Sequence, residues 1–267
     1  MGAMKISYLS LFFYLLLLII PIAILVYLKL KIVRSLLVSV LRMILQLAFV
    51  GVYLEYIFQW DNPFINALWI LVMILVANQS VVRQSGLRFN VFFLYTLPAF
   101  IITMLFSFVT FLIVFDMGSF FSARYLIPIG GMVMGNMLRG NIVSLDRFYH
   151  SLTQREEEYI YYISLGASQR EALLPFIREA LKPALSPYLA TMSTMGLVAL
   201  PGMMTGQILG GASPAVAIQY QVMIVAGIFV ASALSTFLGI LFSLIPSIDP
   251  CGRIRKDIFI EKKLNRQ

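Results

Sequence analysis

The chain has 267 residues, of which 60% are apolar and only 12% charged, and its mean hydropathy is +0.91. A soluble domain has roughly twice this charged fraction, so the composition excludes a single soluble domain, as well as collagen-like and disordered chains. The one cysteine, Cys251, excludes an internal disulfide. A membrane-spanning helix takes about 20 apolar residues, so the apolar content suffices for about seven spans. We therefore predict an all-α integral membrane protein, with residues 1–267 forming a single transmembrane permease domain.

Charges and turn residues divide the chain into apolar segments that predict seven transmembrane helices. The predicted spans cover about residues 7–28, 36–58, 64–82, 90–115, 125–145, 187–200 and 215–244. The first span lacks the small-residue cleavage site of a signal peptide, which favours a retained helix. The last two lie within residues 183–248, where the sequence contains no Asp, Glu, Lys or Arg.

The basic residues predict the orientation in the membrane, because cytoplasmic loops carry an excess of Lys and Arg. With seven spans, 18 of the 20 basic residues fall on the side of the C-terminus, and only Lys5 and Arg124 fall on the other. The N-terminus is therefore predicted outside and the C-terminus in the cytoplasm. Because the basic residues follow the inner membrane face, the net charge of +8 indicates contact with membrane lipid and not with nucleic acid.

Residues 146–185 are the only long segment predicted outside the bilayer, and they read as a cytoplasmic coupling helix pair. Residues 153–156 and 168–171 each fit a capping box, in which Thr or Ser is followed three residues later by Glu. Gly166 lies where a left-handed residue often ends a helix. We predict helices over about 154–165 and 169–182, with Pro175 bending the second.

The apolar sides of these two helices allow two interpretations. The pair lies on the inner leaflet as an amphipathic element, or it docks into a groove of a cytoplasmic partner. The sequence has no G-x-x-x-x-G-K-[ST] phosphate loop, so an ATP-driven transporter would need a separate ATPase subunit. This favours docking. The candidate ATPase-coupling residues are Tyr159, Tyr162, Leu165, Gly166, Ala167 and Ser168.

Polar side chains within the predicted spans are candidates for a substrate pathway, because burying them in hydrocarbon is costly. Arg42 and Gln46 share a stripe of the second span, and Arg42 is near enough to the inner surface to extend its charge into water. Glu55, about 20 Å further along the helix, either lines an outer vestibule or meets water. Asn136 and Asn141 either line a pathway or form hydrogen bonds between helices.

Residues 200–211 follow the sixth predicted span, and their sequence pattern is typical of neither a regular helix nor a polar loop. Glycines recur at every fourth position from Gly202 to Gly210, between two prolines. Irregular backbone at membrane depth is tolerated against protein or a water-filled cavity. We predict a broken or re-entrant element at the outer mouth of the pathway, with tight packing as the alternative. Its pathway candidates are Met203, Met204 and Gln207.

The sequence offers no recognisable metal-binding cluster or hydrolase site. Methionine thioethers bind soft ions, but they also fill apolar gaps. The single histidine, His150, falls in the cytoplasmic segment, and the spans contain no pair of carboxylates. The metal ligands are therefore left unknown, and an intramembrane hydrolase is not supported.

Four stretches of the sequence resemble the FetB (YbbM) permease family, which includes bacterial iron-export permeases and plant aluminium-tolerance proteins. They are VLRMILQLAFVGVYLEYIF in the second span, IPIGGMVMGNML in the fifth, SLGAS in the cytoplasmic turn and LPGMMTGQILGGASPAVAIQYQ after the sixth span. The SLGAS glycine also resembles the turn of the ABC importer coupling loop. The Glu-Ala-Ala that usually precedes that glycine is replaced here by Ile160, Tyr161 and Tyr162.

The resemblance implies the permease subunit of an ABC transporter in the bacterial inner membrane. It implies a homodimer of permeases that works with a separate FetA-type ATPase, with ATP and Mg bound in that partner and no cofactor bound by this chain. Iron export is the first expectation for the substrate. Two alternatives stay open: a stand-alone secondary transporter or channel, for which broken helices are typical, and a non-transporting receptor, for which the short outer loops leave little surface.

Overall fold

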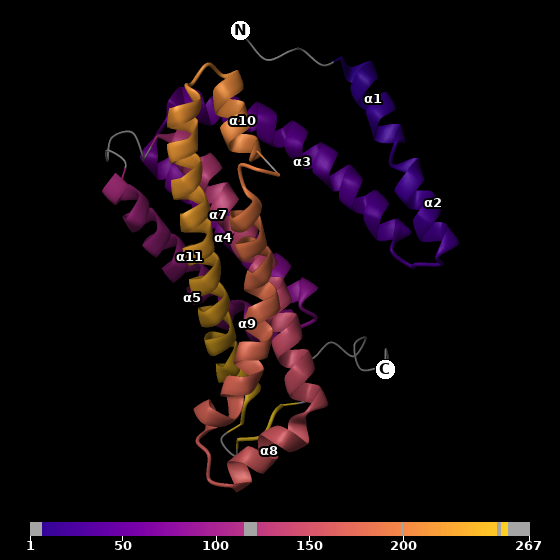
Figure 1. Cartoon of the computed structure of the whole chain (residues 1–267), viewed down its shortest axis with the longest axis vertical. Helices are drawn as coiled ribbons and strands as arrows, with labels where there is room; N and C mark the ends of the chain where they lie inside the picture. The colour runs from indigo at the N-terminus through magenta and orange to yellow at the C-terminus, as the bar shows by residue number, and fades with distance from the viewer. Residues whose placement is uncertain (1–6, 115–121, 199, 250–251, 256–267) are drawn as a thin grey trace.

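The structure, a computed structural model, describes residues 7–114, 122–198, 200–249 and 252–255 (Figure 1). These residues form helices joined by short turns, with an isolated antiparallel bridge between Ile248 and Ile254. The all-α prediction is confirmed. The helices are α1 (Tyr8–Leu16), α2 (Ile19–Tyr27), α3 (Val33–Trp60), α4 (Pro63–Gln84), α5 (Phe89–Val114), α7 (Ala123–Gln154), α8 (Glu156–Ser164), α9 (Gln169–Thr194), α10 (Gly202–Leu209) and α11 (Pro214–Ser247).

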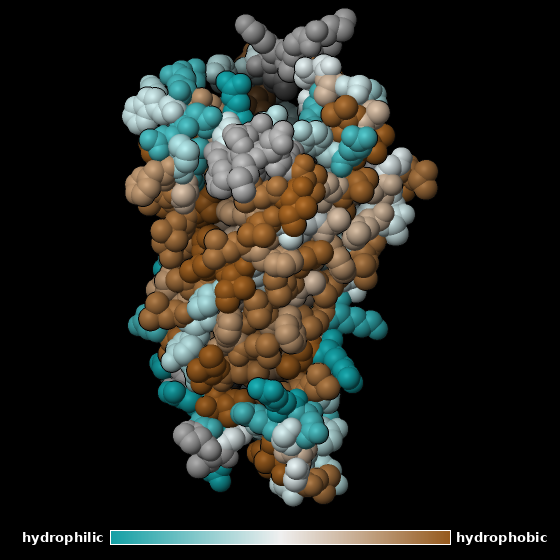
Figure 2. Space-filling view, turned by 90° about the vertical axis from the view of Figure 1, so that its left-hand side faces the viewer, coloured by the Kyte–Doolittle hydropathy of each residue, from teal (hydrophilic) through white to brown (hydrophobic). Residues whose placement is uncertain are grey.

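Five helical segments of the described chain are long and apolar enough to cross a membrane. They are α1 with α2, which together cover Tyr8–Tyr27, and α3, α4, α5 and α11. The more polar helices α7 and α9 run beside them along the long axis (Figure 1). On the face seen in Figure 2, an apolar band crosses the middle of the molecule between more polar ends, as expected for a protein in contact with lipid. Following the predicted orientation, we call the end that carries α8 the inner end and the end that carries α10 the outer end.

The first five predicted spans coincide with helices, but the sixth does not exist as a separate element. The second predicted cytoplasmic helix and the sixth span form one continuous helix, α9, despite three internal prolines at 175, 183 and 187. One face of α9 is buried from Ala172 to Ala184 and packs on α7. Burial of this continuous face outweighs the local cost of the prolines, which a sequence pattern overestimates.

The predicted capping box at residues 153–156 is wrong. Helix α8 starts at Glu156 without a side-chain cap, and the Thr153 hydroxyl donates to the Tyr149 carbonyl at 2.7 Å. Residue 153 is still part of α7, which extends to Gln154, so its side chain bonds back to its own helix. The second box, from Ser168 to Glu171, is present as predicted.

The core lies between α4, α5, α7 and α11, and close helix approach depends on small residues. A Cβ on Gly130 of α7 would lie 2.9 Å from the Ile70 side chain of α4. Helix α3 is different, because Ile57 near its outer end is its only buried residue. That end packs against α4 and α7, while the rest of α3, with α1 and α2, stands apart from the bundle (Figure 1).

Asp61 links the outer ends of α3, α4 and α7 through hydrogen bonds. It follows α3, and its carboxylate accepts hydrogen bonds from the Ala123 backbone amide of α7 at 2.6 Å and from the Asn66 side chain of α4 at 3.3 Å. The Ala123 hydrogen bond is the main reason that the pKa of Asp61 lies below its usual value. The N-terminal ends of α4 and α7 therefore lie side by side at the outer end of the molecule.

Candidate functional site

The turn between α8 and α9 lies at the inner tip of the molecule (Figure 1). Gly166 has φ +89°, the left-handed conformation that the sequence predicted. Ser168 then caps α9: its backbone amide donates to the Glu171 carboxylate at 2.8 Å, and its hydroxyl accepts from the Glu171 amide at 3.4 Å. The Ser168 donors hold the pKa of Glu171 below its usual value. Local chemistry thus fixes the shape of the tip.

The candidate coupling residues differ in how far they reach the surface. Leu165 is 67% exposed, Gly166 and Ser168 are also exposed, and Ala167 and Tyr162 are half-buried. The Tyr162 hydroxyl donates to Glu158 at 3.4 Å. Tyr159 is fully buried, so its side chain has no surface to offer a partner.

Sequence reasoning missed two residues of the exposed tip. Tyr161 is 61% exposed and Ile160 is 45% exposed, and both belong to α8. The helical spacing contained a signal, because Tyr161 and Leu165 are four residues apart and therefore share a face. We define the hairpin tip as Ile160, Tyr161, Leu165, Gly166 and Ser168.

Arg155, which sequence analysis did not select, anchors the base of α8 to α9. Its guanidinium pairs with Glu158 at 3.5 Å and with Glu179 of α9. It also lies over the ring of Phe176, 4.8 Å from the centroid. Ser151 of α7 donates to the same Glu179 carboxylate at 3.2 Å. The hairpin is thus held to both long helices that lead into it.

The pathway candidates lie on three separate helices. Gln46 and Glu55 are both exposed on α3, but nine residues of helix place them on opposite faces. Asn136 of α7 is half-buried; its side-chain amide donates to the Met132 carbonyl at 2.8 Å, and its backbone carbonyl accepts from the Tyr188 hydroxyl of α9 at 2.7 Å. The hydrogen bond from Tyr188 holds α7 against α9, whereas the one to Met132 lies within α7.

The third group, Met203, Met204 and Gln207, lies on α10. All three side chains are half-buried, and Met203 packs against the main core. The segment predicted as broken is therefore a short helix that packs on α11 (Figure 1). A Cβ on Gly202 or Gly206 would meet nothing within 4 Å, so these two glycines are not explained by tight packing within the chain.

Asn141 behaves as a helix-linking residue. Its side-chain amide donates to the Ser235 hydroxyl of α11 at 2.6 Å, across buried surface. Its carbonyl oxygen would lie 2.3 Å from a Cβ on Gly239, so only glycine fits at that position of α11. Of the two asparagine candidates, Asn141 confirms the interhelical hydrogen bond that was considered for both.

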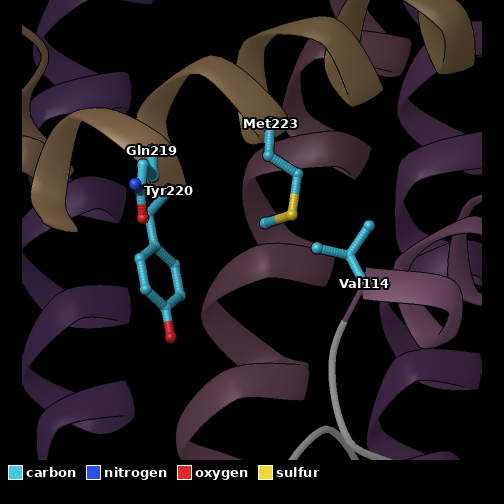
Figure 3. A pocket seen from close by; sticks show the side chains of 4 residues that line it. All are labelled: Val114, Gln219, Tyr220 and Met223. Carbon is cyan, nitrogen blue, oxygen red and sulfur yellow. The ribbon is translucent and has the colours of Figure 1, made fainter.

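The described residues contain a small pocket but no cluster of hard ligands for a metal ion. A pocket of about 210 Å³ lies at the outer ends of α5 and α11, lined by Val114, Gln219, Tyr220 and Met223 (Figure 3). It is smaller than typical ligand pockets of about 300–1,000 Å³. No group of three or more His, Cys, Asp or Glu that could hold a metal ion occurs in the part of the chain that the structure describes.

Comparison with known proteins places the chain in a family. The model of the Uncharacterised protein family (UPF0014) matches residues 8–245. The UPF0014 membrane protein YjkA of Bacillus subtilis is 33% identical over 76% of this chain and 80% of its own length. The probable iron export permease protein FetB of Escherichia coli is 34% identical over 79% of this chain and 80% of its own length.

A plant relative extends the comparison. Protein ALUMINUM SENSITIVE 3 of Arabidopsis thaliana is 36% identical over 75% of this chain and 74% of its own length. No solved structure matches the chain. The match over nearly the whole helical region confirms the resemblance seen in the sequence: the chain belongs to the UPF0014 family of multi-pass membrane proteins, which includes FetB-type permeases.

Proposed function

We propose that this chain is the permease subunit of an ABC transporter that exports iron or another metal ion or complex, driven by a separate FetA-type ATPase. The observation that carries the proposal is the hairpin tip: an exposed apolar surface on a rigid helical hairpin at the predicted cytoplasmic end. The E. coli relative, named as a probable iron export permease, supports the choice of substrate.

The anchoring of the hairpin favours docking over simple adsorption to lipid. Arg155 and the Ser168 capping box fix the hairpin before any partner arrives. A preorganised surface loses less conformational entropy on binding, which favours a specific protein contact. Tyr161 and Leu165 are then the anchors for a groove on the ATPase, in the helix-in-groove mode.

The proposed assembly is a homodimer of permeases with two ATPases in a bacterial inner membrane. No described residue of α1 or α2 is buried, and α3 carries the exposed polar residues Arg42, Gln46 and Glu55 within an apolar span. Polar groups at membrane depth are usually turned to protein or to a water-filled cavity. A second copy of the chain would provide protein contacts for these residues and would enclose a water-filled cavity between the two copies. ATP and Mg would bind in the ATPase, outside this chain.

Reconstitution with and without the ATPase tests this function. Proteoliposomes containing the permease and an ABC ATPase from the same genome are loaded with ATP and Mg, and movement of radiolabelled Fe²⁺ is followed. We expect Fe²⁺ transport only with both proteins and hydrolysable ATP. Transport by the permease alone, driven by an ion gradient, would instead favour the stand-alone secondary transporter or channel.

A further inference from the structure

Tyr159, near the centre of α8, connects the hairpin to the other end of the chain. Its side chain is fully buried, and its hydroxyl donates to the backbone carbonyl of Gly252 at 2.9 Å. Burial raises the pKa of the Tyr159 hydroxyl, so it stays a neutral donor. Gly252 follows α11, the 34-residue helix that runs along the bundle (Figure 1). This hydrogen bond joins α8 to the chain beyond α11.

The backbone around Gly252 has a defined structure, which we call the C-terminal turn (residues 248–249 and 252–255 in the structure). Ile248 and Ile254 form an antiparallel bridge, and the Arg255 amide donates to the Ser247 carbonyl at 2.9 Å. Gly252 has φ +75°, which favours glycine. Ile254, 7% exposed, returns to the main core. The C-terminal turn is therefore a fixed extension of α11.

Helix α11 connects the C-terminal turn at the inner end to α10 at the outer end. Its inner end is fixed to α7, because the Tyr149 hydroxyl donates to the Ser243 carbonyl at 2.8 Å. Its outer end packs against α10, which carries Met203, Met204 and Gln207. At 1.5 Å per residue, α11 spans about 50 Å between these points. Contiguous packed elements of this kind can carry coupling between distant sites.

We propose that Tyr159 and the C-terminal turn form the link through which a movement of α8 reaches α11 and, at its outer end, α10. The inference rests on the proposed function, because the docked ATPase supplies the movement. Tyr159 is in this account a positioning residue: it contacts neither the ATPase nor the substrate. Its hydroxyl transmits the position of α8 to the helix that leads to α10.

The test compares Tyr159→Phe, which removes only the hydroxyl, with Tyr95→Phe, which removes a hydroxyl from α5 at a position that is 40% exposed and lies outside the hairpin tip. Each full-length permease is purified with its ATPase, and hydrogen exchange is measured with and without ATP, Mg and vanadate. We expect the ATP-induced change over residues 202–222 to fall about threefold or more in Tyr159→Phe, about the effect of one lost hydrogen bond. The ATP-induced change at α8 and ATPase binding should stay as in wild type, and the melting temperature should fall by only about 2–4 °C. Tyr95→Phe should keep both exchange responses.

A second variant tests the link from its other side. Gly252→Ala strains the turn and shifts the carbonyl that Tyr159 binds. Because both substitutions break the same link, the double variant should reduce the ATP-induced exchange change over residues 202–222 little more than either substitution alone. A wild-type exchange change over residues 202–222 in both Tyr159→Phe and Gly252→Ala would overturn the inference. So would a double variant in which the two reductions simply add. If the wild-type permease binds no ATPase, the proposed function itself fails and the link fails with it, a result distinguishable because it appears without any substitution.

Discussion

Gly166 shows how a single backbone conformation shapes the proposed docking surface. Its φ of +89° reverses the chain between α8 and α9, and a side chain there has room but not the right backbone preference. A left-handed conformation costs about 1–2 kcal/mol for a residue with a Cβ. The position of Leu165 and Ser168 therefore depends on this glycine.

Gly166→Val should weaken ATPase binding by up to about tenfold while leaving the membrane helices folded, since about 1.4 kcal/mol corresponds to tenfold. Binding of the purified ATPase to permease in nanodiscs measures this. Gly51→Ala is the matched control, because Gly51 of α3 also has open space around it but a helical backbone. Unchanged affinity in Gly166→Val would show that the shape of the tip does not matter for docking.

Asp61 makes stability at the outer end depend on pH. Its folded-state pKa is lowered, chiefly by the Ala123 amide, so its contribution is present above its ordinary pKa of 3.8 and is lost as pH falls through the lower folded value. Asp61→Asn should cost about 0.5–1.5 kcal/mol at neutral pH, the range for one hydrogen bond. Thermal melts at pH 7 and pH 3 should show the difference between wild type and variant shrinking at pH 3. A difference independent of pH would contradict this role.

At the scale of elements, the hairpin is held by contacts between α8 and α9 that local sequence patterns do not reveal. Arg155 looked like part of a capping box, yet it pairs with Glu179, 24 residues away, and stacks on Phe176. The box at Ser168 could be predicted because it involves only neighbours in the chain. The continuity of α9 through its three prolines could not, because it depends on packing against α7.

Exchanging the charges tests the Arg155 anchor. Arg155→Glu and Glu179→Arg should each raise the hydrogen-exchange rate of α8 amides about threefold, and the double variant should recover part of the loss. The pair is 40% and 58% exposed, so a coupling energy of about 0.5–1 kcal/mol is expected. Strictly additive effects would mean that the ion pair contributes nothing to holding the hairpin.

At the scale of the whole molecule, composition and hydropathy predicted the class of fold and most helix positions. Apolar runs of about 20 residues depend only on the chain itself, and α3, α4, α5 and α11 appear where they were expected. The relation between helices was less predictable. Tyr159 was selected for contact with a partner but is buried, because residues beyond α11 return to cover it.

The predicted seven-span topology, with the N-terminus outside, can be tested by cysteine labelling. In a Cys251→Ser background, Leu209→Cys should react with an impermeant maleimide in intact cells, whereas Ser164→Cys should react only after lysis. Both positions are exposed, so access depends on the side of the membrane. Labelling of residue 164 from outside would reverse the orientation and remove the basis for ATPase docking.

The central claim is that the hairpin tip binds a separate ATPase. Photo-crosslinking tests it most directly, with a photoreactive residue in place of Leu165, or of Leu30 as control, which is 45% exposed and predicted on the same side of the membrane. In cells that co-express the ATPase, a crosslink between permease and ATPase from position 165 and none from position 30 is the predicted result. Crosslinks from position 165 to lipid alone would contradict the account.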